Sequence, residues 1–217
     1  MLKADLHIHT TFSPDSTITP ERLVERCLEL GINCIAVTEH NSLAGALAVA
    51  AIAPFKVIPA EEVKSTEGEI IGLFLQEEIP ARLTPEETVA RIKAQGGLVC
   101  LPHPFDRVRR EPLKPEARGR ILPQIDIVEI LNARTTFKAD NDHARAFALE
   151  HGLAMSAGSD AHSPGEVGRA YVEMAEFESP AAFLASLREG RVGGRISSPL
   201  VHVVSSWAKV RRRLRGR

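Results

Sequence analysis

Short apolar runs alternate with amphipathic segments along most of the chain. The apolar runs have the length of β-strands and cover residues 4–10, 33–40, 55–63, 69–75, 97–103, 126–133, 153–160 and 169–174. The segments between them place apolar residues at helical spacing and cover residues 19–31, 42–53, 84–97, 141–152 and 179–190. This alternation predicts an α/β fold in which helices cover a largely parallel sheet.

The helical segments carry capping signals at both ends. Three begin with a hydroxyl residue followed by Pro, which suits the N-cap and first helical positions: Thr19, Thr84 and Ser179. Four are followed by a C-terminal Gly: Gly31, Gly96, Gly152 and Gly190. No linker or low-complexity stretch interrupts the pattern. We therefore expect one domain over residues 1–204, followed by a basic tail or helix over residues 205–217.

Ionisable residues gather where the predicted strands end. Five strands are apolar until their last residues, which read HIHT, VTEH, PAEE, LPH and GSDAH. In a βα barrel the C-terminal ends of the strands meet at one mouth, where active sites lie. If these strands form a barrel, residues 7, 9, 40, 62, 103, 160 and 162 meet in one cleft.

The first strand carries two histidines, one residue apart. Residues i and i+2 of a strand point to the same side, so His7 and His9 share one face, and Leu6 and Ile8 share the other. Two imidazoles on one face suit chelation of a metal ion. A hydrogen-bonded pair in the core or at the surface is the other interpretation, and the four further polar strand ends favour the metal.

Size and composition indicate a globular protein. The chain has 217 residues, 44% of them apolar. It has no signal-like segment and no apolar run long enough to span a bilayer, so we expect a cytoplasmic protein without a membrane partner. The three cysteines, Cys27, Cys34 and Cys100, lack CxxC spacing and are expected to be buried free thiols.

The charge distribution is uneven. Residues 209–217 carry six of the 27 basic residues and no acidic residue, which leaves 21 basic against 28 acidic residues elsewhere. An acidic body is expected where carboxylates gather around cations, and it argues against a whole surface built for nucleic acid. Trp207, Val210 and Leu214 form an apolar stripe in the tail, so a helix there could dock on the domain or touch RNA or an anionic surface.

Five motifs together resemble the PHP family, named for polymerase and histidinol phosphatase. They are DLHIHTTFSPDS (5–16), VTEHN (37–41), IPAEEV (58–63), LPHPF (101–105) and GSDAHS (158–163). They cover the chain nearly end to end, in order and at spacings similar to those of the family. The resemblance implies a distorted barrel of seven βα units that holds two or three divalent metal ions, namely Mn, Fe or Zn, and hydrolyses phosphate esters by metal-activated hydroxide.

The resemblance also implies the ligands of each metal. His7 and His9 would bind the first metal with Glu62 and Asp160. Glu62 would bridge to a second metal, which His103 also binds. A third metal would be bound by Asp15, His40 and His162. The mixture of imidazole and carboxylate ligands suits Zn²⁺, Mn²⁺ or Fe²⁺ on chemical grounds alone.

The expected ligand set depends on two assignments, the identity of the bridging glutamate and the role of Glu69. The family places its bridging Glu three residues after a Pro, here Pro59, which selects Glu62 and leaves Glu61 on the opposite side of the strand. Many relatives carry a further histidine where this sequence has Glu69. Glu69 is expected to ligate in its place and to favour Mn²⁺ or Mg²⁺ over Zn²⁺; a plain strand-start residue is the alternative.

Several other residues are expected near the mouth. Glu129 and Asp5 are expected to orient ligands rather than to coordinate metal. Arginines at the mouth are candidates for phosphate contacts, with Arg107 and Arg134 preferred over Arg109 and Arg110. His40 or His162 could donate a proton to the leaving oxygen if its metal site were empty.

The expected substrate is a phosphorylated small molecule. The compact size and the motifs look most like stand-alone members that act on nucleoside 3′,5′-bisphosphates or trim short oligonucleotides. A phosphatase for histidinol phosphate or another small metabolite is the alternative within the class. A metal-dependent amidohydrolase would need a bridging Lys that no convincing strand end supplies, and a degenerate domain that only binds nucleic acid is the non-enzymatic alternative. The sequence makes no prediction of oligomeric state.

Overall fold

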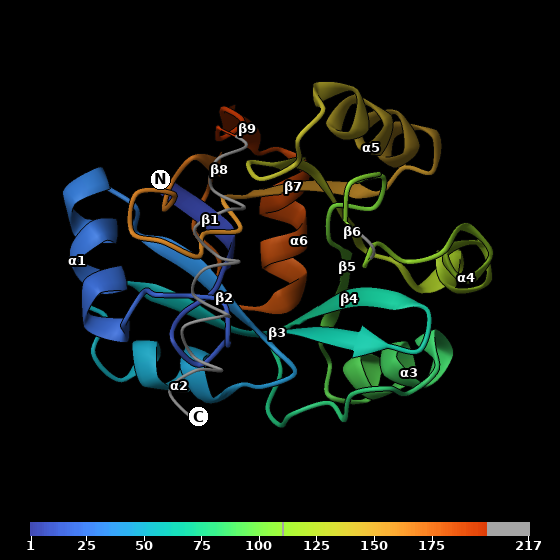
Figure 1. Ribbon diagram of the computed structural model, residues 1–217, viewed down its shortest axis with the longest axis horizontal. Helices are drawn as coiled ribbons and strands as arrows, with labels where there is room; N and C mark the ends of the chain where they lie inside the picture. The colour runs from blue at the N-terminus through green and yellow to red at the C-terminus, as the bar shows by residue number, and fades with distance from the viewer. Residues whose placement is uncertain (110, 199–217) are drawn as a thin grey trace.

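One nine-stranded sheet organises the part of the chain that the computed structural model describes, residues 1–109 and 111–198 (Figure 1). Its strands are β1 (Leu2–Ile8), β2 (Cys34–His40), β3 (Lys56–Ser65), β4 (Gly68–Leu73), β5 (Leu98–Leu101), β6 (Ile127–Asn132), β7 (Ala154–Gly158), β8 (Ala170–Met174) and β9 (Arg191–Gly194). The first eight overlap the ranges predicted from the sequence. The ninth was not predicted, because Arg-Val-Gly-Gly is short and has a single apolar side chain.

The sheet runs in the order β7-β6-β5-β4-β3-β2-β1-β8-β9 and bends until β7 lies beside β1. The backbone N–H of Asp160 donates to the carbonyl of His7 at 2.7 Å, and the N–H of His9 donates to the carbonyl of Ala161 at 3.1 Å. These two bonds nearly close the barrel, with β8 and β9 outside the closure. The predicted distorted barrel is thereby confirmed, with nine strands in place of seven regular units.

Half of the pairings between the described strands are antiparallel. They join β1 to β8, β3 to β4, β4 to β5, and β8 to β9. Only residues 66 and 67 separate β3 from β4, which leaves no room for the crossover that a parallel pair needs. The expected helix cover is therefore missing at this point of the barrel.

Within the described ranges, six helices and one 3₁₀ turn cover the sheet: α1 (Pro20–Leu30), α2 (Ala44–Ala50), α3 (Pro85–Ala94), α4 (Pro115–Ile121), η1 (Leu122–Gln124), α5 (Lys138–Glu150) and α6 (Pro180–Arg188). The predicted N-caps form, since Thr19, Thr84 and Ser179 each accept a backbone N–H from the first turn. The sequence did not predict α4, whose seven residues include Gly119.

Among the described residues, buried apolar side chains form three clusters. One packs around α6, whose fully buried Phe183 lies among strand residues such as Ala36 and Ile58 (Figure 1). A second lies between the sheet and α3, α4 and α5, and a third lies beneath α1 and α2. This apolar core fixes the positions of the strand ends that carry the polar residues.

The first strand departs from regular alternation. Leu6 belongs to the cluster around α6, whereas Ile8 belongs to the cluster beneath α1 and α2. The prediction that they share a face is wrong, because the register between β1 and β2 shifts between Asp5 and Ile8. Such an irregularity turns the end of a strand relative to its beginning.

Three further expectations can be compared with the structure. Cys27, Cys34 and Cys100 are buried free thiols, as predicted. Within the described ranges, no helix has the length and apolar character needed to cross a bilayer. Arg110 and the tail, including Trp207, Val210 and Leu214, lie outside the described residues.

Candidate metal centre

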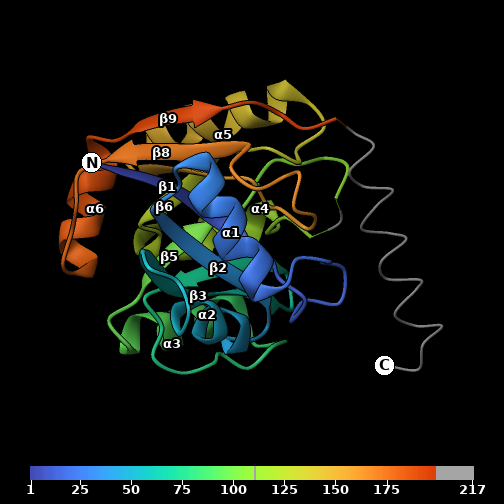
Figure 2. The same cartoon turned by 90° about the vertical axis from the view of Figure 1, so that its left-hand side faces the viewer.

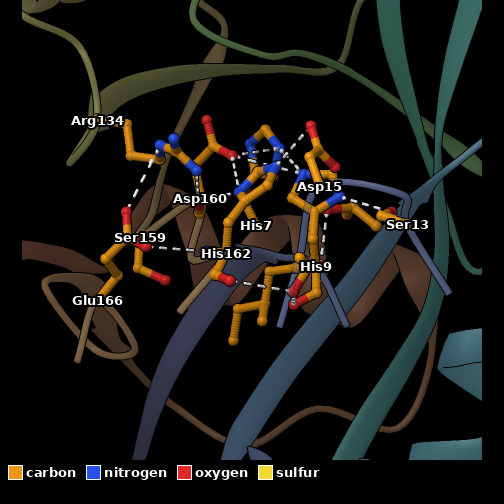
Figure 3. A network of polar contacts seen from close by, with 12 residues as sticks. His7, His9, Ser13, Asp15, Arg134, Ser159, Asp160, His162 and Glu166 are labelled. Atoms are coloured by element: carbon orange, nitrogen blue, oxygen red, sulfur yellow. Dashed lines mark hydrogen bonds and ion pairs between the residues drawn. The ribbon is translucent and has the colours of Figure 1, made fainter. Parts of the chain in front are cut away.

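All nine side chains predicted as metal ligands lie together at the mouth of the barrel. Each has a charged or imidazole atom within 3.8 Å of another member of the set. The set is His7, His9, Asp15, His40, Glu62, Glu69, His103, Asp160 and His162. Eight of these residues are buried, and His40 is partly exposed. Figure 3 shows five of them, from β1 and from the segments after β1 and β7, pointing toward one another.

His7 and His9 present the same ring nitrogen to the centre. Their Nε2 atoms are 3.2 Å apart. Nδ1 of His7 lies 3.0 Å from Glu129 Oε1, and Nδ1 of His9 lies 3.2 Å from Ser13 Oγ. A carboxylate can only accept, so Nδ1 of His7 carries a proton and donates it. Each ring is thus held by one nitrogen while the other faces the cluster.

Glu62 is the member with the most imidazole neighbours. Its Oε1 lies 3.4 Å from His7 Nε2 and 3.1 Å from His103 Nε2. Its Oε2 lies 3.5 Å from His9 Nε2 and 3.0 Å from His40 Nδ1. The two oxygens therefore face two different groups of histidines, as a bridging carboxylate does.

Glu61 points away from this cluster. Its Oε2 accepts the backbone N–H of Ile79 at 2.9 Å, on the other side of β3. Burial raises the pKa of Glu61 to about 7. The choice between the two glutamates made from the sequence therefore matches where the structure places them.

Asp15, His40 and His162 form the third group expected from the sequence. Asp15 Oδ1 lies 3.6 Å from His40 Nε2, and Asp15 Oδ2 lies 3.4 Å from His162 Nε2. His162 Nδ1 donates to the carbonyl of Asp160 at 2.8 Å, which leaves Nε2 facing Asp15. Burial opposes ionisation of Asp15, but the two imidazoles outweigh it and hold the pKa of Asp15 well below its ordinary value.

Asp160 and His103 have backbone conformations that L-residues seldom adopt. Their φ angles are 52° and 29°. The N–H of Asp160 is bound by His7, as described above, and the N–H of His103 donates to Glu129 Oε2 at 2.8 Å. Strained residues persist where surrounding contacts fix them, and they cluster at functional sites. Here the strain turns both side chains into the mouth.

Glu69 lies at the edge of the cluster, 3.8 Å from His103 Nε2 through its Oε2. It also groups with His40 and Glu62 closely enough for one ion to contact all three. Burial, and then the Glu62 carboxylate, raise the pKa of Glu69 well above its ordinary value. A cation in this position would remove that repulsion, as expected for a ligand.

The donor atoms fit divalent metal ions. In the part of the chain that the structure describes, four groups of three residues each place their ligand atoms within 4.8 Å of one another: His7, His9 and Asp160; His7, Glu62 and His103; His40, Glu62 and Glu69; and His9, His40 and His162. Burial, and then the His162 and His40 imidazoles, lower the pKa of His9 to about 3, so this ring stays neutral. A neutral imidazole with Nδ1 bound elsewhere offers its Nε2 lone pair to a metal.

Glu39 and Ser13 hold His9, and the sequence analysis missed both. The Ser13 hydroxyl donates to Glu39 Oε2, so it accepts from Nδ1 of His9. Glu39 Oε1 also accepts the N–H of Thr10 at 2.9 Å. A Cβ on Gly45 would lie 2.2 Å from Glu39 Oε1, so only glycine leaves room for this carboxylate. Two features of the sequence could have pointed to Glu39: it precedes the predicted ligand His40, and Gly45 is the second residue of α2.

Glu129 holds His7, as expected from the sequence. It binds Nδ1 of His7 through Oε1 and accepts from the Asn132 side chain through Oε2 at 3.0 Å. A Cβ on Gly158 would lie 2.2 Å from the Cβ of His7, so the GSDAH motif needs its glycine for this close approach.

Asp5 contacts backbone groups rather than the His7 ring. Its Oδ1 accepts the N–H of Ser159 at 2.8 Å, and its Oδ2 accepts the N–H of Gly168 at 3.0 Å. Asp5 thereby ties the segment after β7 to β1. Its expected orienting role acts on the backbone beside Asp160 and not on an imidazole.

The mouth arginines differ in how they are placed. Arg109 pairs with Asp160 and lies 3.5 Å from Asp106, with 17% of its side chain exposed. Arg134 is buried and lies 3.5 Å from the Asp160 carbonyl through Nη1 and 3.5 Å from Glu166 through Nε (Figure 3). Arg107 binds Asp140 of α5 through Nε at 2.8 Å, although 57% of its side chain is exposed.

Comparisons with known proteins show the family to which this chain is similar. The PHP domain family model matches residues 5–94, and the PHP-associated model matches residues 138–192. An uncharacterised protein of Methanocaldococcus jannaschii is 39% identical over 199 residues, which cover 86% of this chain and 79% of the relative. The 5′-3′ exoribonuclease Rnm of Salmonella typhimurium is 33% identical over 122 residues, which cover 55% of this chain and 36% of the exoribonuclease.

Solved structures share the fold at low sequence identity. A two-domain Bacteroides vulgatus protein described as containing a predicted PHP-like metal-dependent phosphoesterase has a TM-score of 0.73 at 18% identity, over 95% of this chain and 69% of that one. PsfC from Pseudomonas syringae has a TM-score of 0.69 at 18% identity, over 98% of both chains. The lesion-specific endonuclease EndoQ of Pyrococcus furiosus has a TM-score of 0.66 at 17% identity, over 88% of this chain and 57% of that one.

Proposed function

This chain belongs to the PHP family of metal-dependent phosphoesterases, and we propose that it hydrolyses a phosphate ester of a nucleotide. The substrate is a nucleoside 3′,5′-bisphosphate or the 5′ end of a short oligonucleotide. The observation that carries the proposal is the position of Glu62, whose two oxygens face His7 and His103 on one side and His9 and His40 on the other. Similarity to the exoribonuclease Rnm supports a nucleotide over other phosphate esters.

The nine side chains of the cluster hold two or three divalent ions in this proposal. His7, His9 and Asp160 form one group, Glu62 and His103 with Glu69 form the second, and Asp15, His40 and His162 form the third. Bound Mn²⁺, Fe²⁺ or Zn²⁺ would supply Lewis-acid activation of water and neutralise phosphate charge. Glu69 in place of a histidine favours the harder Mn²⁺ at the second group.

The chain's own residues bind and orient the ester. Arg109 lies beside Asp160, so its guanidinium can reach a phosphate held at the cluster. Arg134 contacts the same residue from the buried side, through the Asp160 carbonyl. Arg107 is more exposed and is assigned to a second, non-scissile phosphate, for which it would share its guanidinium with Asp140.

The leaving oxygen needs a proton. His40 is the partly exposed member of the cluster, with 23% of its side chain accessible. Burial opposes its protonation, but Asp15 and Glu62 raise the pKa of His40 well above its ordinary value. If the third group holds no metal ion, His40, or His162 across Asp15, is placed to donate a proton to the leaving group.

A substrate panel tests the proposal. Purified chain is assayed with Mn²⁺ and separately with Zn²⁺ on adenosine 3′,5′-bisphosphate, AMP, a 5′-phosphorylated RNA trimer and histidinol phosphate, with His7→Ala as the control. Release of phosphate or nucleotide from the bisphosphate or trimer, abolished in the variant, supports the proposal. Preference for histidinol phosphate, or binding of the trimer without hydrolysis by any metal form, would contradict it.

A further inference from the structure

Basic side chains without ion pairs gather around the ribbon formed by β8 and β9. Elsewhere most cations are paired, as Arg22 is with Glu25 and Lys64 is with Glu111. Around the ribbon, six cations form no ion pair with any residue in ranges 1–109 and 111–198. They are Lys3, Arg145, Arg169, Arg188, Arg191 and Arg195. In a chain with an excess of acidic residues, this is an unusual local concentration of positive charge.

Five of these six cations, all but Lys3, line three depressions that share residues. The first, about 460 Å³, is lined by Arg26, Arg169 and Arg195. The second, about 410 Å³, lies between α5 and the end of β9 and is lined by Arg195, Lys138 and Arg145. The third, about 510 Å³, is lined by Arg145, Arg188 and Arg191. Arg195 lines both the first and the second depression, and Arg145 lines both the second and the third, so the three are together called the β9 track. Strand β9, after which the track is named, runs beside β8 (Figure 2).

Acidic residues also lie along the track, among them Asp142, Glu150, Glu173 and Glu189. Asp142 lines the second depression and pairs with Lys138 at 2.7 Å. Glu173 of β8 is the register partner of Arg191. The arginines that join the depressions, Arg145 and Arg195, have no such partner among the described residues.

One end of the track adjoins the metal centre. Two residues after Arg195, the N–H of Ser197 donates to the carbonyl of Ala133 at 2.6 Å, next to Arg134. The first depression is also lined by Gly165 and Gly168, which flank Glu166. Glu166 accepts the N–H of His162 at 3.3 Å. The same short loop therefore forms a wall of the track and supports a residue of the cluster.

We propose that the β9 track binds the phosphate backbone of a single-stranded nucleic acid whose end is presented to the metal centre. This inference rests on the proposed function, and it adds a site outside the cluster. Spaced guanidinium groups along a hollowed path suit successive phosphates, each of which accepts two N–H bonds from one Arg.

Recognition at the track is of the backbone rather than of bases. Tyr171 lines the first depression, but Lys3 Nζ lies over its ring at 4.5 Å, and Gly193 packs so closely that a Cβ there would lie 2.7 Å from the ring. The ring is thus not open for base stacking. Leu149, on α5 beside the third depression, is the only large apolar residue of the track that is mostly exposed in the described structure, which disfavours insertion into a membrane.

The test compares two charge-matched double variants of the full chain. Arg145→Ala/Arg195→Ala removes the shared arginines, and Arg91→Ala/Lys114→Ala removes two exposed, unpaired cations on α3 and before α4. Binding of a fluorescent single-stranded RNA 12-mer is measured in EDTA at several salt concentrations. We expect about tenfold or greater loss of affinity in the first variant and a salt dependence shallower by about 1.4 in the log–log slope, at about 0.7 per lost phosphate contact. The control variant should bind as the unmodified chain does.

Each outcome decides the track separately from the proposed function. Equal RNA affinity in all three proteins, or equal loss in both variants, would overturn the track. Dependence on Arg145 and Arg195 for vesicles containing phosphatidylserine, but not for RNA, would also overturn it. Hydrolysis of adenosine 3′,5′-bisphosphate should be unchanged in the track variant. If the unmodified chain hydrolyses no nucleotide yet binds RNA through these arginines, the proposed function fails and the track stands.

Discussion

The Nε2 atoms of His7 and His9 face each other at 3.2 Å, and each ring is held by a bond at its other nitrogen. Two lone pairs at this distance repel, so the arrangement is stable only with a proton or a cation between them. Burial opposes protonation of His7, but Asp160, Glu129 and Glu62 raise the pKa of His7 well above its ordinary value. The same carboxylates make the position equally favourable for a divalent metal ion.

Metal binding should therefore stabilise the fold. At a free Mn²⁺ concentration 100 times the dissociation constant, one site adds about 2.7 kcal/mol to the free energy of unfolding. Thermal unfolding monitored with and without EDTA should show a higher Tm with Mn²⁺. The rise should be lost in Glu62→Gln, and an equal rise in that variant would show that the metal binds elsewhere.

The two neighbouring glutamates of β3 should differ sharply in their effect on activity. We expect Glu62→Ala to lower kcat/KM by 100-fold or more, or about 2.7 kcal/mol, because the residue joins two ligand groups. Glu61→Ala should keep most of the activity and lower only stability, since Glu61 binds the N–H of Ile79. Equal losses of kcat/KM in the two variants would contradict the bridging role.

Removing the support of His9 should weaken the metal site without removing a ligand. Ser13→Ala deletes the hydroxyl between His9 and Glu39, and we expect a 10- to 100-fold loss of metal affinity, in the range typical of groups that orient a ligand. The control is Ser186→Ala, whose hydroxyl binds the carbonyl of Ala175 far from the cluster. The affinity is measured by titration with Mn²⁺. Partial recovery of the affinity in Ser13→Thr would distinguish this role from a general loss of stability.

Arg107 and Arg134 should differ in how much their substitution affects hydrolysis of bisphosphates compared with monophosphates. We expect Arg107→Ala to cost about 1.5–3 kcal/mol in kcat/KM on a nucleoside 3′,5′-bisphosphate and much less on the matching monophosphate. Arg134→Ala, next to the Asp160 carbonyl, should impair both substrates. If Arg107→Ala affects the two substrates by the same factor, a second phosphate does not bind there.

The three cysteines should be unreactive in the folded chain. Burial raises the pKa of Cys34 to about 12 and also raises the pKa of Cys27 and Cys100. At pH 8, which is well below these raised pKa values, the three thiols stay protonated and buried. A thiol reagent at this pH should therefore label none of them in the folded chain and all three after denaturation. Rapid labelling of the native chain would show that one of these thiols becomes exposed in solution.

The sequence by itself predicted eight of the nine described strands and the polar residues at five of their ends. Asp15 and Glu69 were added to the expected cluster through the resemblance to the PHP family. Apolar runs of strand length end in His, Glu or Asp at five places. The C-terminal ends of the strands in a βα barrel meet at one mouth, so these residues converge whatever the details of side-chain packing. The resemblance to the PHP family, which places its bridging Glu three residues after Pro59, selected Glu62 over Glu61. Adjacent strand residues face opposite ways, so only one of these two glutamates could face the cluster.

Only the tertiary structure decided which partner each of these side chains has. The bulge in β1, the hairpin between β3 and β4, and the ribbon of β8 and β9 depend on pairing between distant segments, which local periodicity does not encode. In the same way Arg107 faces Asp140, Arg109 faces Asp160, and Ser13 joins His9 to Glu39. Distances of a few ångströms between residues far apart in the chain are set by how the whole barrel closes, and hydrogen bonds and ion pairs depend on those distances.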